Sequence, residues 1–163
     1  MSSYLTTGSR AVWTALKAGA RVAPYMAENH GTYYEENEES KKALKVTKSD
    51  CPAIIMVPGV SGIAIAAATN ETYDVPLPLN FDLRVDSPSV DDAVDFWEIV
   101  VRDIHAAWRA NRFGLANSAG CYNTRPGAAF VRKLYDGPEN ALVFVSWQVE
   151  WTYTLLFRRN IAV

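Results

Sequence analysis

The residue types that carry out most catalysis are scarce in this chain and poorly spaced for it. The sequence of 163 residues contains two histidines and two cysteines. His30 and His105 do not form a pair with metal-ligand spacing, and Cys51 and Cys121 lie far apart in the chain. His105 sits in an expected helix, where a packed or surface histidine is a simpler interpretation than a general base. We therefore predict no catalytic residues and no metal site.

Nucleotide-binding and nucleophile motifs are also missing from the sequence. Gly59 and Gly62 lie in a glycine-containing segment that has no P-loop lysine and no dinucleotide-binding fingerprint. No serine occupies a nucleophile-elbow pattern. Cys121 would act as a nucleophile only if a distant base approached it, and we expect both cysteines to be reduced thiols. We predict no cofactor and no cofactor-binding residues.

Composition indicates one ordinary globular domain that spans residues 1–163. Hydrophobic residues make up 49% of the chain, charged residues 21%, and the formal net charge is −2. Without a basic excess, a dedicated nucleic-acid reader is not expected. No apolar run approaches the roughly 20 residues that span a bilayer, and the first ten residues lack a signal-peptide pattern. We expect neither membrane association nor secretion.

The strongest structural pattern lies at 141–157, where large apolar residues alternate with mostly polar ones. Such alternation buries one face of a β-strand. Strands usually contain about 5–6 residues, so a strand this long should cross a whole sheet and project past it. We predict that its apolar face packs against a helix at 90–111. The residues of this face are Val143, Val145, Trp147, Val149, Trp151 and Tyr153.

Two helices are predicted from capping signals and apolar spacing. The first covers 10–23, between Ser9 as N-cap and Pro24 as its end. The second covers 90–111 after Ser89 as N-cap and ends by Gly114. The apolar stripe of the second helix consists of Val90, Val94, Trp97, Val101, Ile104 and Trp108. Ala93, Phe96, Val100 and Ala107 widen this stripe.

The remaining segments predict short strands and loops. Residues 53–57 form an apolar run typical of a strand buried on both faces. Residues 75–85 alternate, but Pro76 and Pro78 cannot donate to a ladder, so the start of this strand should lie at an edge or a bulge. Residues 114–129 are rich in small residues and are predicted to form a loop.

A further strand is predicted at 130–135, before a turn that leads into the final strand. The main elements then follow the order α-β-β-α-β-β. The economical solution is an α+β fold with an antiparallel or mixed β-sheet and the two main helices packed on one face.

Several features in the same order resemble a known family. After the opening helix, a charged stretch leads to Asp50-Cys51-Pro52 and the short apolar strand 53–57. The alternating strand 77–85 precedes an acidic-capped helix with a tryptophan, Asp91 to Glu98, and a long alternating strand follows. This order resembles the tail terminator proteins of long-tailed bacteriophages. The longer segments at 59–74 and 114–129 depart from the compact pattern and leave a neighbouring neck protein, a head-to-tail connector or stopper, as an alternative.

The resemblance implies a structural virion protein and not an enzyme. It implies a homo-oligomer, a hexameric ring that caps the tail tube and joins it to the head. The implied partners are the tail tube protein and the head-completion or connector proteins. DNA would pass through the pore without specific binding, and no membrane would be involved. The implied location is the neck, or tail end, of a virion assembled in the host cytoplasm.

A closed ring requires two complementary faces on every subunit, and an exposed edge strand offers backbone groups to a neighbour. Segments 28–50, 59–74 and 114–129 exceed the usual connection length of about 4–6 residues and are expected to make such contacts. Acidic groups lining a pore would repel DNA, although a solvated loop is the plainer interpretation of the acidic cluster. The candidate interaction residues are Tyr33, Tyr34, Glu35, Glu36, Glu38, Glu39, Gly62, Ile63 and Ile65.

A second hypothesis comes from a different functional class. The protein would be a small α+β ligand-binding domain or enzyme whose curved sheet encloses an apolar, aromatic-lined pocket. Trp97, Trp147 and Trp151 would line this pocket. The mass in solution separates the two hypotheses, because a ring is expected for the first and a monomer or dimer for the second.

Overall fold

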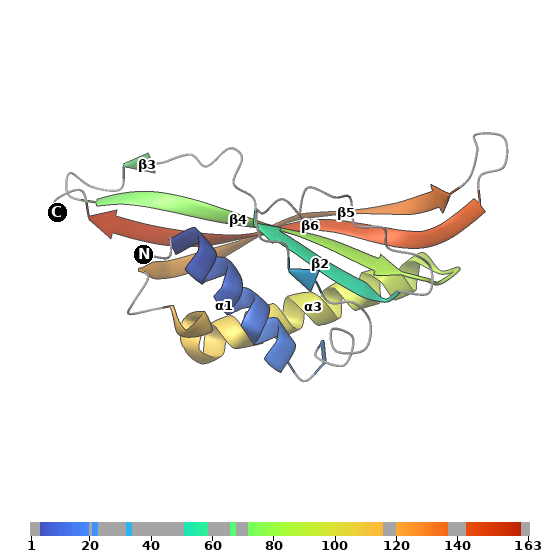
Figure 1. The fold of residues 1–163 in the computed structure, drawn as a ribbon, viewed down its shortest axis with the longest axis horizontal. Helices are drawn as coiled ribbons and strands as arrows, with labels where there is room; N and C mark the ends of the chain where they lie inside the picture. The colour runs from blue at the N-terminus through green and yellow to red at the C-terminus, as the bar shows by residue number, and fades with distance from the viewer. Residues whose placement is uncertain are drawn as a thin grey trace.

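A computed structural model describes residues 4–19, 21–22, 32–33, 51–58, 66–67, 72–115, 120–136 and 143–160. The main elements follow the order α-β-β-α-β-β, and both long helices lie on one face of the sheet (Figure 1). The elements are α1 (Tyr4–Ala18), β1 (Thr32–Tyr33), β2 (Ala53–Pro58), β3 (Ala66–Ala67), β4 (Thr72–Val85), α3 (Val90–Asn111), a 3₁₀ turn (Arg112–Gly114), β5 (Cys121–Asp136) and β6 (Val143–Asn160). The predicted α+β fold is confirmed.

The sheet is mixed but dominated by antiparallel pairs. Its strand order is β1-β2-β4-β6-β5, with β3 paired to the start of β4. Among the described strands, only β1 runs parallel to its partner β2, whereas β2, β4, β6 and β5 pair in antiparallel fashion. β4 pairs with β6 from Thr72 opposite Asn160 to Val85 opposite Trp147. Residues 143–146 of β6 pair with β5 but not with β4, so the β5–β6 hairpin extends past the end of β4.

The alternation predicted for the final strand is confirmed, and β6 continues to Asn160. Trp151 is 2% exposed, and the edge of Trp97 from α3 meets it with ring centroids 6.1 Å apart. The apolar face of β6 therefore packs on α3 as expected. The side chains of Val143 and Val145 lie outside the described part. Trp147, also predicted on this face, is only partly buried and packs at the margin of the core.

Helix α1 approaches the sheet closely because Gly8 has no side chain. A Cβ atom on Gly8 would lie 2.9 Å from Phe157 Cζ and 3.0 Å from Leu77 Cδ2. The predicted span of 10–23 is wrong: the helix begins at Tyr4 and ends at Ala18. Ser9 is fully buried inside the helix and does not cap it. Small residues that resemble a helix start are used here for close packing.

Helix α3 has the predicted bounds and the predicted N-cap. The Ser89 hydroxyl accepts a hydrogen bond from Asp91 N at 3.2 Å. The predicted stripe is shifted, because Val90 is 39% exposed and most of the stripe is only partly buried. The fully buried side chains of this helix are Ala93, Phe96, Val100 and Ile104. Both rows have helical spacing, so periodicity could not decide which one faces the sheet.

The two prolines of β4 lie where the strand has a partner on one side. Pro76 and Pro78 are registered with β6. On the other side, β2 reaches only to Leu79 and β3 covers Tyr73 and Asp74. No described strand covers this second side of β4 at residues 75–78, which is the edge position predicted for the two prolines.

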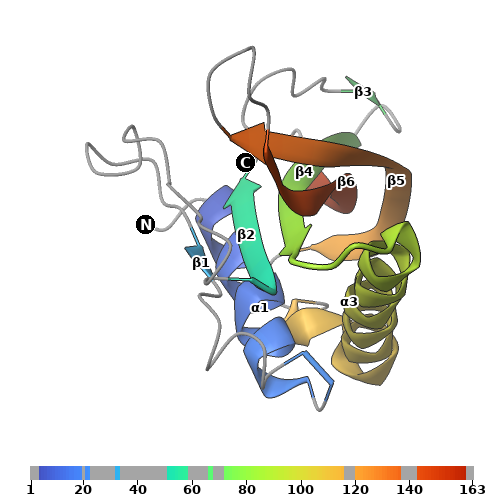
Figure 2. The same cartoon turned by 90° about the vertical axis from the view of Figure 1, so that its right-hand side faces the viewer.

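The predicted loop at 114–129 is wrong, because β5 already begins at Cys121. This part of β5 is the outer strand of the curved sheet and is mostly exposed (Figure 2). Its pairing with β6 is also irregular between Pro126 and Ala129. Exposure and a bulge together remove the alternation by which sequence patterns identify a strand.

Candidate interaction surface

The sheet face opposite the helices is polar and carries ordered charges. Arg84 forms an ion pair with Asp82 at 2.9 Å. Arg132 Nε donates to Gln148 Oε1 at 2.7 Å, and its Nη2 donates to Glu150. Both carboxylates have guanidinium partners, and these charge-assisted bonds fix side chains on this face.

A shallow hollow interrupts this polar face beside β5. Its volume is about 390 Å³. Phe130 is 66% exposed at the hollow and Val57 is 39% exposed, while the buried residues Phe81 and Trp151 also border it. The full lining consists of Val57, Asn80, Phe81, Asp82, Ala128, Phe130, Glu150, Trp151 and Thr152. Of the three tryptophans expected in an aromatic pocket, only Trp151 lines the hollow.

The bulge in β5 is built around one close contact with β6. Trp151 Nε1 donates to Gly127 O at 3.1 Å. A Cβ atom on Gly127 would lie 2.8 Å from Thr152 O, so only glycine fits without movement of the backbone. After this bulge the edge strand presents Phe130 and Val131, and Val131 is 40% exposed.

A second polar group joins β4, β5 and β6. Asp74 accepts hydrogen bonds from Tyr122 Oη at 2.8 Å and from Arg158 Nε at 2.9 Å. The Arg158 guanidinium also lies 4.5 Å from the centroid of the Tyr122 ring. The hydrogen bond from Arg158 is the largest cause that lowers the pKa of Asp74. Burial and the bond to Asp74 raise the pKa of Tyr122. This group clamps three strands together.

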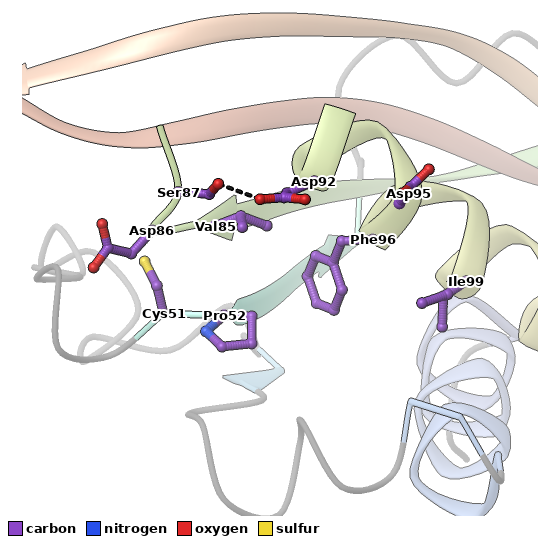
Figure 3. A pocket seen from close by; sticks show the side chains of 9 residues that line it. All are labelled: Cys51, Pro52, Val85, Asp86, Ser87, Asp92, Asp95, Phe96 and Ile99. Carbon is purple, nitrogen blue, oxygen red and sulfur yellow. Dashed lines mark hydrogen bonds between the residues drawn. The ribbon is translucent and has the colours of Figure 1, made fainter. Parts of the chain in front are cut away.

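A cavity of about 300 Å³ lies beside the N-terminus of α3 (Figure 3). Its residues are Cys51, Pro52, Val85, Asp86, Ser87, Asp92, Asp95, Phe96 and Ile99. The Ser87 hydroxyl donates to Asp92 and accepts from Ser89 N at 3.1 Å, so it orders the start of the helix. Across the described ranges, no three His, Cys, Asp or Glu side chains are grouped to hold a metal ion.

Cys121 is poorly placed for nucleophilic catalysis. Neither Cys51 nor Cys121 forms a disulfide. Cys121 is 1% exposed, and burial raises the pKa of its thiol to about 11. At neutral pH it is therefore protonated and a poor nucleophile. His105 is exposed on α3, in agreement with the expected surface histidine. His30 lies outside the described residues.

Most interaction residues proposed from sequence also fall outside the described ranges. Tyr33 lies in β1, opposite Met56 of β2. Tyr34, Glu35, Glu36, Glu38, Glu39, Gly62, Ile63 and Ile65 are not described. Sequence reasoning did not single out Phe130 and Val131. The available signal was an adjacent apolar pair between Pro126-Gly127 and Arg132-Lys133, but exposure cannot be read from it.

Comparisons with known proteins give little further information. No family model matches the sequence, and no curated protein matches it. One similar solved structure is a chain of "Virion of native gene transfer agent (GTA) particle", with 13% sequence identity and a TM-score of 0.49. The match covers 96% of this chain and 100% of that chain. A similarity at this level does not identify a family or a function. No described helix is both long enough and apolar enough to cross a membrane.

Proposed function

We propose that this protein is a structural virion protein, a ring-forming tail terminator that caps the tail tube of a phage-like particle and joins it to the head. The order of sequence elements described above motivates this assignment. The observation that carries it is the asymmetry of the sheet. One face is covered by α1 and α3, while the other face and the outer edge of β5 remain uncovered in the described part of the chain.

Such asymmetry suits a closed ring. Each subunit of a ring must present two unlike surfaces, one to each neighbour. One side of this sheet presents two helices, and the other presents polar side chains of the strands (Figure 1). The β5–β6 hairpin, which extends beyond β4, adds a projecting element through which a subunit can reach a neighbour.

The proposed partners are further copies of the chain in a hexameric ring, the tail tube protein and the head-completion or connector proteins. Within this proposal, segment 28–50 with its acidic residues faces the pore, where its negative charge repels the passing DNA. The segment around Ile63 and Ile65 contacts the tube or a neighbour. The protein acts by binding and needs no cofactor.

The test is an assembly reaction with the tail tube protein, read by electron microscopy. The full chain should form rings on one end of each tube and should stop tube growth. A variant lacking residues 61–72 should fold, as judged by its circular dichroism, but should leave tubes overlong or unjoined to heads. Tubes whose lengths are unaffected by the full chain would contradict the terminator role. Tubes of normal length that fail to join heads would favour a connector or stopper.

The hollow beside Phe130 is the observation that keeps a ligand-binding domain as the second candidate. Its volume of about 390 Å³ lies within the range of small-molecule sites. A monomer that binds a small apolar compound at this hollow, and does not interact with tail tubes, would favour this candidate. Loss of that binding on Phe130→Ser would locate the compound.

A further inference from the structure

One part of the β5 edge is regular enough to accept another strand. The pairing of β5 with β6 runs without interruption from Ala129 opposite Trp151 to Leu134 opposite Ser146. Irregularities bound this window on both sides, at Pro126/Ala129 and Leu134/Tyr135. No described strand pairs with the outer side of β5. Residues 129–133 therefore present an extended, regular backbone on an open edge.

The same window exposes apolar side chains on both faces of the strand. Phe130, opposite Glu150, is 66% exposed on the uncovered face of the sheet. Val131, opposite the buried Val149, is 40% exposed on the helical face. A strand laid along this edge would cover both side chains at once. A partner placed on one face of the sheet would cover only one of these side chains, whereas a strand paired along the edge would cover both.

The usual protection of an edge strand is weak in this window. Natural edges are protected by proline, bulges and charges that project over the edge. Pro126 and its bulge protect only the first half of β5. The charges of the second half are held on their own sheet: Arg132 is bonded to Gln148 and Glu150, and Lys133 Nζ lies 5.2 Å from the Trp147 ring centroid.

The sequence of the window is complementary to itself in one alignment. In an antiparallel pair centred on Val131, Phe130 faces Arg132 of the other copy and Ala129 faces Lys133. No like charges are opposite each other, and the ordered Arg132 guanidinium can lie on the Phe130 ring. A parallel in-register pair would instead place Arg132 beside Arg132 and Lys133 beside Lys133, which is unfavourable.

We propose that residues 129–133 of β5 pair in antiparallel fashion with the same residues of a second copy of this chain, centred on Val131. This contact is isologous and closes after two copies. It is therefore separate from the contact that repeats around the proposed ring and does not depend on it. It covers the open edge of β5 in the free protein.

Disulfide trapping tests this register directly. In a background with Cys51→Ser and Cys121→Ala, Val131→Cys places two thiols opposite each other, with Cα atoms about 4.5–5.5 Å apart, within disulfide reach. The matched control Lys133→Cys places its two thiols about 14 Å apart along the strands. We expect Val131→Cys to form covalent dimers at least tenfold faster than Lys133→Cys. A mixture of Ala129→Cys and Lys133→Cys chains should form disulfides between the two variants.

Sedimentation of the unmodified chain provides the second measurement. The wild type should shift from its monomer mass of 18.1 kDa to twice that mass as concentration rises. Phe130→Arg should raise the dissociation constant at least tenfold, because it places two arginines opposite each other. Equal trapping rates for Val131→Cys and Lys133→Cys, or no mass increase, would overturn the proposal. Equal trapping rates in the free protein, together with rings that still form on tail tubes, would overturn this contact and leave the proposed function intact.

Discussion

Replacement of Trp151 should be the most damaging single change in the sheet. Its side chain is 2% exposed, and the rings of Phe81 and Tyr153 lie 5.4 and 5.5 Å from it by centroid distance. Its indole also donates to Gly127 O at 3.1 Å. Removal of a large aromatic from a packed core costs about 3–5 kcal/mol. We expect Trp151→Ala to lower the free energy of unfolding by about this amount, measured by urea denaturation.

A graded series separates packing from hydrogen bonding. Trp151→Phe keeps most of the apolar volume but removes the donor to Gly127 O, which should cost about 0.5–1.5 kcal/mol because Gly127 is exposed and water can replace the donor. Trp147→Ala is the control, because this tryptophan is only partly buried, and it should cost less than Trp151→Ala. A loss below about 1 kcal/mol for Trp151→Ala, or a larger loss for Trp147→Ala, would refute the placement of Trp151 at the centre of the core.

Three further changes test separate parts of the structure. Asp103→Ala should lower the unfolding free energy by about 1.5–3 kcal/mol, because Asp103 Oδ2 accepts a hydrogen bond from Val22 N at 2.9 Å in the turn that follows α1. Urea denaturation would show this loss, and an unchanged free energy would refute a stabilising role for the bond. In the native protein Cys121 should react with a thiol reagent at least a hundredfold more slowly than after unfolding, because burial raises the pKa of its thiol to about 11. Equal reaction rates before and after unfolding would contradict the burial of Cys121. The ion pair with Arg158 lowers the pKa of Asp74 in the folded protein. The stability that this pair contributes is therefore present above the pKa of Asp74 in the unfolded chain, and it is lost as the pH falls through the pKa of Asp74 in the folded protein. Below about pH 4, wild type should therefore lose more stability than Asp74→Asn, and equal losses in urea midpoints would refute this.

The elements predicted best from the sequence were those with long periodic patterns. The final strand and α3 each bury one side along many residues, so their type and most of their bounds could be read directly. The start of α1 could not, because Gly8 and Ser9 resemble a helix start, whereas in the structure Gly8 packs against Phe157 and Ser9 is buried inside the helix. Which face of α3 is buried depends on the position of the sheet and is not contained in helical spacing.

The sequence did not predict the first half of β5 or the exposed residues of the candidate surface, and both failures have the same physical reason. An edge strand has fewer neighbours, so selection for alternation is weak, and Pro126-Gly127 resembles a loop although it forms a bulge beneath Trp151. The exposure of Phe130 follows from its place at the sheet edge. Of the interaction residues chosen from sequence, only Tyr33 lies within the described ranges, and all of them stay predictions.

Removal of this protein from an assembling particle tests its proposed role most directly. Tail lengths and head attachment would be measured by electron microscopy in its presence and in its absence. A ring-forming terminator predicts overlong tails that accumulate apart from heads when the protein is missing, and tails of uniform length joined to heads when it is restored. Tails of normal length joined to heads in its absence would contradict the proposed function.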